Sequence, residues 1–165
     1  LTNPSHPDYA VIGVYDTALI KPVAQTLKEL GMKRGFVVHG SGYDEVSVSG
    51  PSEYARLYEN GDIQTGRFTP ADFGITAKYT EEDVTGGLPA ENARIAQAVL
   101  SGCGKPAHND MVCANMALLL LAGNRVQSIA EGVELARQTL ATGRTLGIVE
   151  AHRDFARNGT LAQAA

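Results

Sequence analysis

The stretch that decides the fold is Arg34-Gly-Phe-Val-Val-His-Gly-Ser-Gly-Tyr-Asp-Glu-Val-Ser-Val-Ser-Gly50. Its apolar part, 35–39, has the composition of a β-strand, and Gly40-Ser41-Gly42 lets the backbone turn sharply after it. Two adjacent carboxylates, Asp44 and Glu45, come just beyond the turn. The pattern indicates a strand followed by an acidic loop, which is either a cation site or a hairpin-like turn with two solvated acids.

The sequence before this stretch predicts a βαβ unit. Residues 9–15 form a nearly continuous apolar run, which is typical of a strand buried on both faces. A helix follows, capped by Asp16 or Thr17 and ended by Gly31, with apolar residues at helical spacing: Ile20, Val23, Leu27 and Leu30. Because this helix connects two parallel strands, the acidic loop is expected at the carboxyl edge of the sheet, where ligands of open sheets bind.

The remaining sequence predicts short strands and then helices. We expect antiparallel strands at 46–48, 54–58 and 63–68, with Asn60-Gly61 as a hairpin turn, and a loop at 80–87. Helices are expected from Pro89 and at 111–121, 128–140 and 145–156. The fold class is therefore α/β, with a mixed, mostly parallel sheet and helices packed on it. We expect one domain at 1–157 and a flexible tail at 158–165.

The composition of the chain argues against several classes of function. A chain of 165 residues that is 44% hydrophobic suits one domain with a core, and a net charge of −4 without a Lys/Arg cluster argues against a nucleic-acid partner. The apolar run at 116–122 is far shorter than a membrane span, no signal pattern opens the sequence, and Cys103 and Cys113 suit reduced thiols. We expect a cytoplasmic protein without a membrane partner. Because the chain begins at Leu1 in a loop-like sequence, we also expect a preceding segment in the natural polypeptide.

The candidate site residues are the metal ligands Asp44 and Glu45. Hard oxygen ligands without sulfur or imidazole favour Mg²⁺ over zinc, and Mg²⁺ usually binds one or two carboxylates plus substrate phosphates. His39 is expected to be structural, because the sequence places no nucleophile beside it. Asn115, inside the most apolar helix, is either a satisfied core amide or a cavity-lining group. No catalytic or organic-cofactor-binding residue is predicted.

The order and spacing of several short motifs resemble the carboxyl-terminal part of the anthranilate phosphoribosyltransferase family, from Leu1 to about Ala156. The motifs are Leu1-Thr-Asn-Pro4, Val11-Ile-Gly-Val-Tyr15, Val37-Val-His-Gly-Ser41, Asp44-Glu45-Val-Ser47, Thr69-Pro-Ala-Asp-Phe-Gly74, Gly86-Gly87 and Glu91-Asn92-Ala93. The resemblance implies the larger α/β domain of a nucleoside phosphorylase/phosphoribosyltransferase-type fold. It also implies that Asp44 and Glu45 match the acidic pair that binds Mg²⁺ together with phosphoribosyl pyrophosphate.

The implied reaction is attack of the anthranilate amine on the ribosyl anomeric carbon with release of pyrophosphate, a step of tryptophan biosynthesis. The resemblance further implies a homodimer when the enzyme is intact. The family's glycine-rich pyrophosphate loop, anthranilate-contacting arginine and helical domain lie upstream of the matched segment, so we expect the isolated chain to be inactive. Two alternatives remain: a pyrimidine nucleoside phosphorylase-like enzyme, and a non-catalytic relative that binds nucleic acid or a partner.

Overall fold

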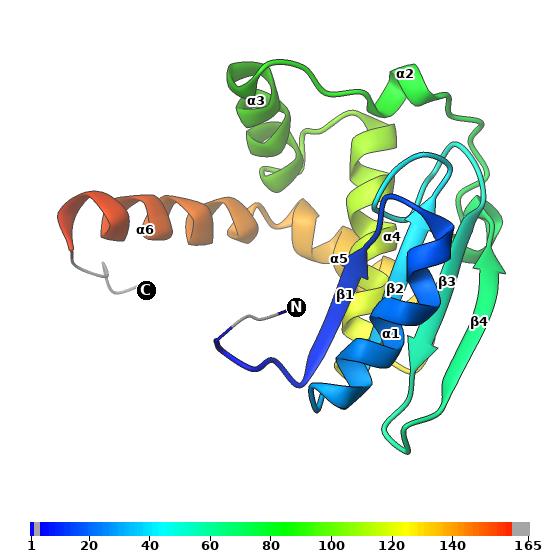
Figure 1. The fold of residues 1–165 in the computed structure, drawn as a ribbon. Helices are drawn as coiled ribbons and strands as arrows, with labels where there is room; N and C mark the ends of the chain where they lie inside the picture. Colours follow the sequence, from blue (N-terminus) through cyan, green and yellow to red (C-terminus); the bar gives the residue numbers. More distant parts are fainter. Residues whose placement is uncertain (2–3, 160–165) are drawn as a thin grey trace.

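The structure is a computed structural model that describes residue 1 and residues 4–159. A four-stranded sheet in the order β1-β2-β3-β4 organises it (Figure 1). The strands are β1 (Tyr9–Gly13), β2 (Arg34–Gly40), β3 (Ser52–Leu57) and β4 (Ile63–Phe68). Within the described ranges, no helix is both long and apolar enough to cross a bilayer.

The predicted βαβ unit is present. Strands β1 and β2 pair in parallel, with Tyr9 opposite Arg34, and the short 3-10 helix η1 (Thr17–Leu19) and helix α1 (Ile20–Glu29) connect them. Strands β2, β3 and β4 pair antiparallel in sequence order. The mixed α/β class is therefore confirmed, with one correction: parallel pairing is confined to β1 and β2 in the described sheet. The reason is that the later strands follow one another directly and each reverses the chain, with no crossover helix between them.

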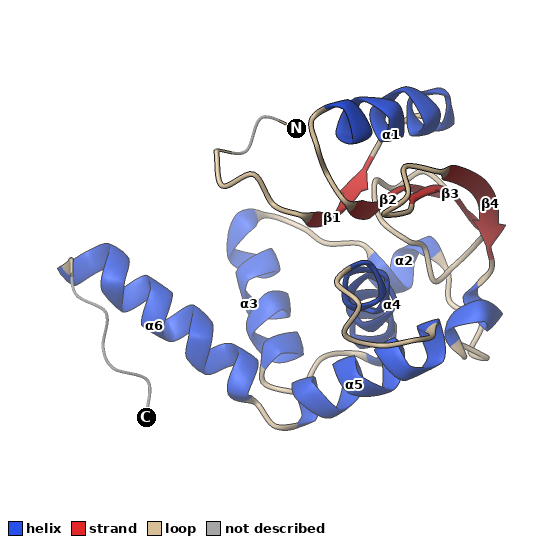
Figure 2. Cartoon of the chain, turned by 90° about the horizontal axis from the view of Figure 1, so that it is seen from below, coloured by secondary structure: helices blue, strands red, loops and turns tan. Residues whose placement is uncertain are grey.

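Helices cover both faces of the sheet (Figure 2). Helix α1 buries Ile20, Ala24 and Leu27 against one face. Helices α4 (Pro106–Ala122) and α5 (Ile129–Ala141) lie on the other face, where α4 buries Cys113, Ala114, Ala117 and Leu118. The expectation that the most apolar helix is central is confirmed, because α4 contacts both the sheet and α5.

The predicted strand at 46–48 is wrong. Val46, Ser47 and Val48 are buried, but side chains bond to the backbone of Val46 and Ser47: Asn115 bonds to Val46, and serine hydroxyls organise the backbone from Ser47 onward. The Ser47 amide donates to Ser52 Oγ at 2.9 Å, and Ser47 Oγ accepts from the amides of Ser49 at 3.1 Å and Gly50 at 3.2 Å. Serine hydroxyls that bond nearby backbone in this way replace a strand ladder with a tight loop.

The helical part contains one element that we did not predict. Residues expected as loop include helix α2 (Glu81–Val84), which Thr80 and Asp83 begin with a reciprocal capping box. The other elements are η2 (Pro70–Phe73), α3 (Pro89–Leu100) and α6 (Arg144–Asn158). Helix α6 extends away from the sheet (Figure 1) and continues through Asn158, two residues beyond the end predicted for the last helix, while the flexible tail at 158–165 stays a prediction. Residues 160–165 of that tail lie outside the described residues.

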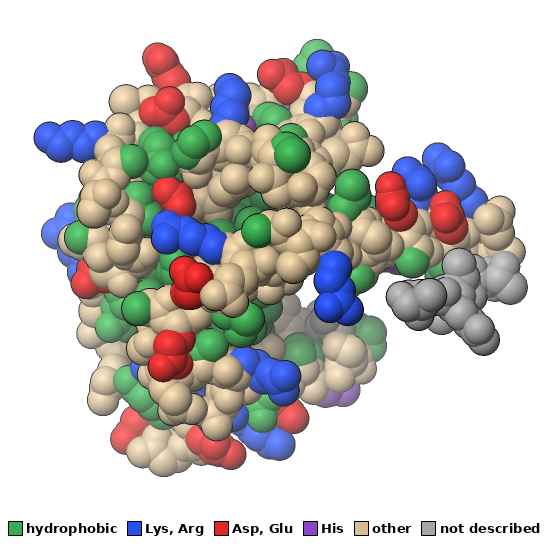
Figure 3. Space-filling model, turned by 180° about the vertical axis from the view of Figure 1, so that it is seen from behind, with side chains coloured by type: hydrophobic (Ala, Val, Ile, Leu, Met, Phe, Trp, Pro, Cys, Tyr) green, Lys and Arg blue, Asp and Glu red, His purple; other side chains and the backbone are tan. Residues whose placement is uncertain are grey.

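Charged side chains are spread over the surface. On the face drawn in Figure 3, acidic and basic side chains of the described residues are interspersed over the body of the molecule. This distribution agrees with the slightly negative net charge of −4.

Candidate functional site

A tight turn positions the acidic loop. The Gly40 amide donates to the Tyr43 carbonyl, and the Tyr43 amide donates to the Gly40 carbonyl, both at 2.9 Å. The two residues between them, Ser41 and Gly42, have φ values of 45° and 95°. Positive φ at both central positions is the pattern of a type I′ turn, which glycine and small polar residues accept most easily. The sharp turn predicted from Gly40-Ser41-Gly42 is therefore confirmed.

Gly13 allows the acidic loop to lie directly on the end of β1. A Cβ added at Gly13 would overlap the carbonyl oxygen of Asp44 and would come within 2.9 Å of the Asp44 Cβ. Figure 1 shows the loop after β2 at the same end of the sheet as the arrowhead of β1. The structure thus places Asp44 and Glu45 at the carboxyl edge of the parallel pair, as the βαβ argument predicted.

The side chain of Asn115 holds the acidic loop from the opposite side. Asn115 Oδ1 accepts from the Val46 amide at 2.8 Å, while Nδ2 donates to the carbonyls of Val46 at 3.1 Å and Met111 at 2.9 Å. Val46 directly follows Glu45, so one amide on α4 fixes the backbone beside the acidic pair. Both readings of Asn115 hold: it is a satisfied amide, and it lines the groove described next.

Asp44 and Glu45 line a groove between β1 and α4 with a volume of about 750 Å³. Its apolar walls include Val11 from β1, and Met116 and Leu119 from α4. Partial burial of the carboxyl raises the pKa of Glu45 above its ordinary value, and the neighbouring Asp44 carboxylate raises it further. Both causes disfavour two bare negative charges at this position, and a bound cation removes the repulsion between them.

The structure also shows the surroundings of His39 and of the acidic pair. His39 Nδ1 donates to the Val14 carbonyl at 2.8 Å, which ties β2 to the end of β1 and is compatible with the expected structural role. Within residues 1 and 4–159, no group of three or more His, Cys, Asp or Glu side chains is arranged to hold a metal. The acidic pair therefore stands without a third such side chain among the described residues.

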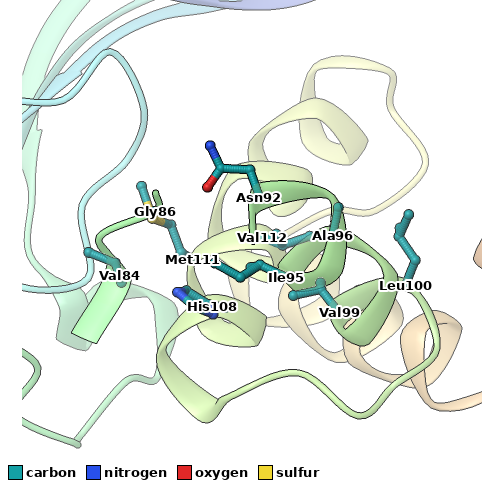
Figure 4. Close-up of a pocket in the computed structure, with 10 residues that line it drawn as sticks. All are labelled: Val84, Gly86, Asn92, Ile95, Ala96, Val99, Leu100, His108, Met111 and Val112. Carbon is teal, nitrogen blue, oxygen red and sulfur yellow. The ribbon is translucent and has the colours of Figure 1, made fainter. Parts of the chain in front are cut away.

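A second pocket of about 360 Å³ adjoins the groove and shares Met111 and Val112 with it. Figure 4 shows its apolar lining from α3 and α4, with the His108 ring beside Ile95 and Met111. Its lining contains neither Asp44 nor Glu45. The carboxylates thus distinguish the 750 Å³ groove as the candidate site.

Replacing Gly13 by Ala will destabilise the fold, because the new methyl group must displace the Asp44 backbone. Overpacking of this kind typically costs about 1–3 kcal/mol of unfolding free energy. Gly147→Ala is the matched control: an added Cβ there meets nothing within 4 Å, and alanine favours a helix interior. Urea unfolding of both variants measures the difference, and equal stability would show that the Gly13–Asp44 contact is not tight.

Comparison with known proteins identifies the family that this chain resembles. Residues 1–146 match the family described as "Glycosyl transferase family, a/b domain". Anthranilate phosphoribosyltransferase of Aeromonas hydrophila is 41% identical over 88% of this chain and 42% of its own length. The corresponding protein of Symbiobacterium thermophilum is 41% identical over 94% of this chain and 45% of its own length. The chain thus spans less than half the length of these relatives.

Solved structures give the same result. Anthranilate phosphoribosyltransferase from Thermus thermophilus superposes with a TM-score of 0.75 and 32% identity, covering 88% of this chain and 42% of that one. The Saccharomyces cerevisiae enzyme in complex with PRPP and Mg superposes with a TM-score of 0.73 and 27% identity, covering 88% and 40%. The resemblance found in the sequence motifs is confirmed, and the chain belongs to the glycosyl transferase family through its α/β domain.

Proposed function

We propose that this chain supplies the acidic, Mg²⁺-binding part of an anthranilate phosphoribosyltransferase. The intact enzyme transfers the phosphoribosyl group of phosphoribosyl pyrophosphate to anthranilate and releases pyrophosphate. The observation that carries the proposal is the acidic pair Asp44 and Glu45, held at the carboxyl edge of β1 and β2 in a chain 41% identical to such enzymes. Relatives solved with PRPP and Mg, and with 4-fluoroanthranilate, support the substrate class.

The donor set suits Mg²⁺. Asp44 and Glu45 offer carboxylate oxygens, and Mg²⁺ typically takes one or two carboxylates and completes its shell with water and substrate phosphates. When bound, the ion neutralises the negative charge that develops on the departing pyrophosphate. A site with only two carboxylates leaves room for those phosphate oxygens, which a closed cage of protein ligands would exclude.

The residues of this chain act mainly by preorganisation. The turn at Ser41 and Gly42, the contact of Gly13 with Asp44, and the Asn115 amide hold the acidic segment before any substrate arrives. Donors and charges fixed in this way need not reorganise during the reaction, which is where electrostatic catalysis gains most. Asp44 and Glu45 would thus hold Mg²⁺, and through the ion they would orient the pyrophosphate end of the substrate.

Two further expectations from the sequence remain predictions. They are homodimer formation by the intact enzyme and the absence of a nucleic-acid partner. Among the described residues, nothing favours the nucleoside phosphorylase alternative or the non-catalytic one.

A chimaeric enzyme tests the proposal. Residues 1–146 replace the matching segment of the Aeromonas hydrophila relative, and production of phosphoribosyl anthranilate is followed by the loss of anthranilate fluorescence. We expect Mg²⁺-dependent turnover within about tenfold of the parent, a change of at most about 1.4 kcal/mol in activation free energy. The isolated 165-residue chain is expected to give no turnover. A folded but inactive chimaera would contradict the proposed function.

A further inference from the structure

The pocket of about 360 Å³ between α3 and α4 lies outside the proposed Mg²⁺ site. Its lining, drawn in Figure 4, comes from the end of α2, from α3 and from the first half of α4. The walls are mainly large apolar side chains: Val84, Ile95, Val99, Leu100, Met111 and Val112. Ligand pockets in proteins typically enclose about 300–1,000 Å³, so a pocket near the lower end of this range suits a small molecule.

His108 is the polar side chain in this pocket that lacks a partner. It lines the pocket from the first turn of α4, and only 8% of the residue is exposed. Within residues 1 and 4–159, no hydrogen bond joins its ring to another side chain or to the backbone. Buried polar groups are normally hydrogen-bonded, and an imidazole carries at least one N–H donor in either protonation state. The ring is therefore available to pair with a molecule in the pocket.

The rim of the pocket beside α3 is held in place by Asn92. Its Oδ1 accepts from the Gly87 amide at 2.8 Å, and its Nδ2 donates to the Gly87 carbonyl at 3.0 Å. A Cβ added at Gly86 would overlap Asn92 Oδ1, so glycine at this position allows the close approach. The rim is thus formed before a ligand arrives, as is usual for small-molecule sites. Because Asn92 already bonds within the chain, His108 is left as the side chain that can select a polar group.

The chemistry of the lining favours an uncharged aromatic ligand. The pocket is lined by no Asp, Glu, Lys or Arg side chain of the described residues, and a charged group is costly to bury without an opposite charge. The thioether of Met111 lies in the wall, and thioethers make favourable contacts with aromatic rings. An apolar cavity of about 150 Å³ can hold benzene. The present pocket is larger and has room for a bicyclic molecule.

We propose that the pocket between α3 and α4 binds a small uncharged aromatic molecule whose hydroxyl or N–H group hydrogen-bonds to His108. The apolar walls supply most of the affinity, and the single imidazole fixes the orientation of the ligand. This binding site does not depend on the function proposed for Asp44 and Glu45, although Met111 and Val112 line both cavities.

Titration calorimetry of the unmodified 165-residue chain is the first test. The probes are β-naphthol, naphthalene and β-naphthoate, which share one ring system and differ in having a hydroxyl, no polar group or a charge. We expect one molecule of β-naphthol to bind per chain, about tenfold more tightly than naphthalene, the usual effect of one net hydrogen bond. The charged β-naphthoate should bind most weakly. Absence of β-naphthol binding, or an affinity no higher than that of the other two probes, would overturn the proposal.

Replacement of His108 tests the polar contact itself. His108→Leu keeps an apolar side chain in the wall and removes both ring nitrogens. We expect its affinity for β-naphthol to fall about tenfold, to the level of naphthalene, while its affinity for naphthalene changes little. His108→Gln keeps a donor and should retain part of the preference for the hydroxyl. A preference that persists in full in His108→Leu contradicts the assignment, and if neither variant folds, the three probes on the unmodified chain decide.

Two alanines on α3 test where the ligand lies. Ala96 and Ala93 are both exposed, but only Ala96 lines the pocket. Ala96→Phe places a phenyl ring at the pocket and should weaken β-naphthol binding at least about tenfold, because the ring occupies space that the ligand needs. Ala93→Phe is the matched control and should bind as the unmodified chain does. Equal binding by the two variants would show that β-naphthol lies elsewhere, for example in the 750 Å³ groove, and would overturn the site.

A competing occupant is a side chain from the part of the relatives that this chain does not span. The chimaeric enzyme contains the whole pocket, because all of its lining residues lie within 1–146. We expect the chimaera to bind β-naphthol within about threefold of the isolated chain, less than the tenfold effect of one hydrogen bond. Loss of binding in a folded chimaera would show that protein fills the pocket, and would overturn the proposal. A chimaera that binds β-naphthol without turnover contradicts the proposed function only, and an active one that does not bind it contradicts the pocket only.

Discussion

Replacing Asp44 by Asn and Glu45 by Gln together will lower turnover of the chimaeric enzyme by about a thousand-fold. A bound metal ion supplies several kcal/mol of charge stabilisation at a departing phosphate group. Because each 1.36 kcal/mol corresponds to a factor of ten in rate, a loss of about 4 kcal/mol gives that figure. The loss should persist at saturating Mg²⁺, since neutral amides of the same shape hold the ion poorly.

Folding should survive this double substitution. The Asp44 carboxylate raises the pKa of Glu45, so the two acids repel each other in the folded protein, and neutral amides relieve that repulsion. We therefore expect an unchanged or slightly higher melting temperature. Glu81→Gln with Glu82→Gln is the matched control, because these acids are also adjacent and exposed but belong to α2 and do not line the groove.

Steady-state rates across a Mg²⁺ titration, together with Mn²⁺ binding followed by electron paramagnetic resonance, measure the effect. Mn²⁺ binding should be lost in the Asp44/Glu45 variant and kept in the Glu81/Glu82 variant. An Asp44/Glu45 variant with parental turnover and parental Mn²⁺ affinity would eliminate the metal assignment.

Local sequence signals were sufficient to predict the strands, helix and turn that position the acidic pair. The apolar run of β1, the helical spacing in α1 and the glycines after β2 act over short range, and together they determine where Asp44 and Glu45 lie. Two local signals were misread. Ser47 replaces ladder hydrogen bonds with its own hydroxyl, and the capping pair Thr80 and Asp83 begins a helix inside a polar stretch.

The contacts that fix the site depend on tertiary structure. Asn115 bonds to Val46 across 69 positions of sequence, and Gly13 at the end of β1 meets Asp44 in the loop that follows β2. An amide within the apolar sequence predicted as a helix at 111–121 was the one available signal for Asn115. That signal shows that a partner must exist, because buried amides are hydrogen-bonded, but it cannot show which backbone group the partner is.

Asn115→Leu will weaken metal binding in the chimaeric enzyme by about 10–100-fold, the usual range when a residue that orients a metal ligand is lost. Leucine has a similar volume but cannot bond to the Val46 amide or carbonyl, so both groups lose their partner. Each unpaired backbone group costs about 1–3 kcal/mol of stability. The segment carrying Asp44 and Glu45 then moves more freely, and the KM for the magnesium complex of phosphoribosyl pyrophosphate should rise more than kcat falls.

A second amide on the same helix separates positioning from stability. Asn109 also lies on α4, but its Nδ2 donates at 3.1 Å to the carbonyl of Gly104, which is outside the acidic loop. Asn109→Leu should therefore leave Mn²⁺ affinity unchanged, whatever its effect on the melting temperature. If both variants weaken Mn²⁺ binding equally, Asn115 acts only through the general stability of α4. If only Asn115→Leu does so, the metal affinity of the acidic pair depends on a hydrogen bond made one residue beyond it.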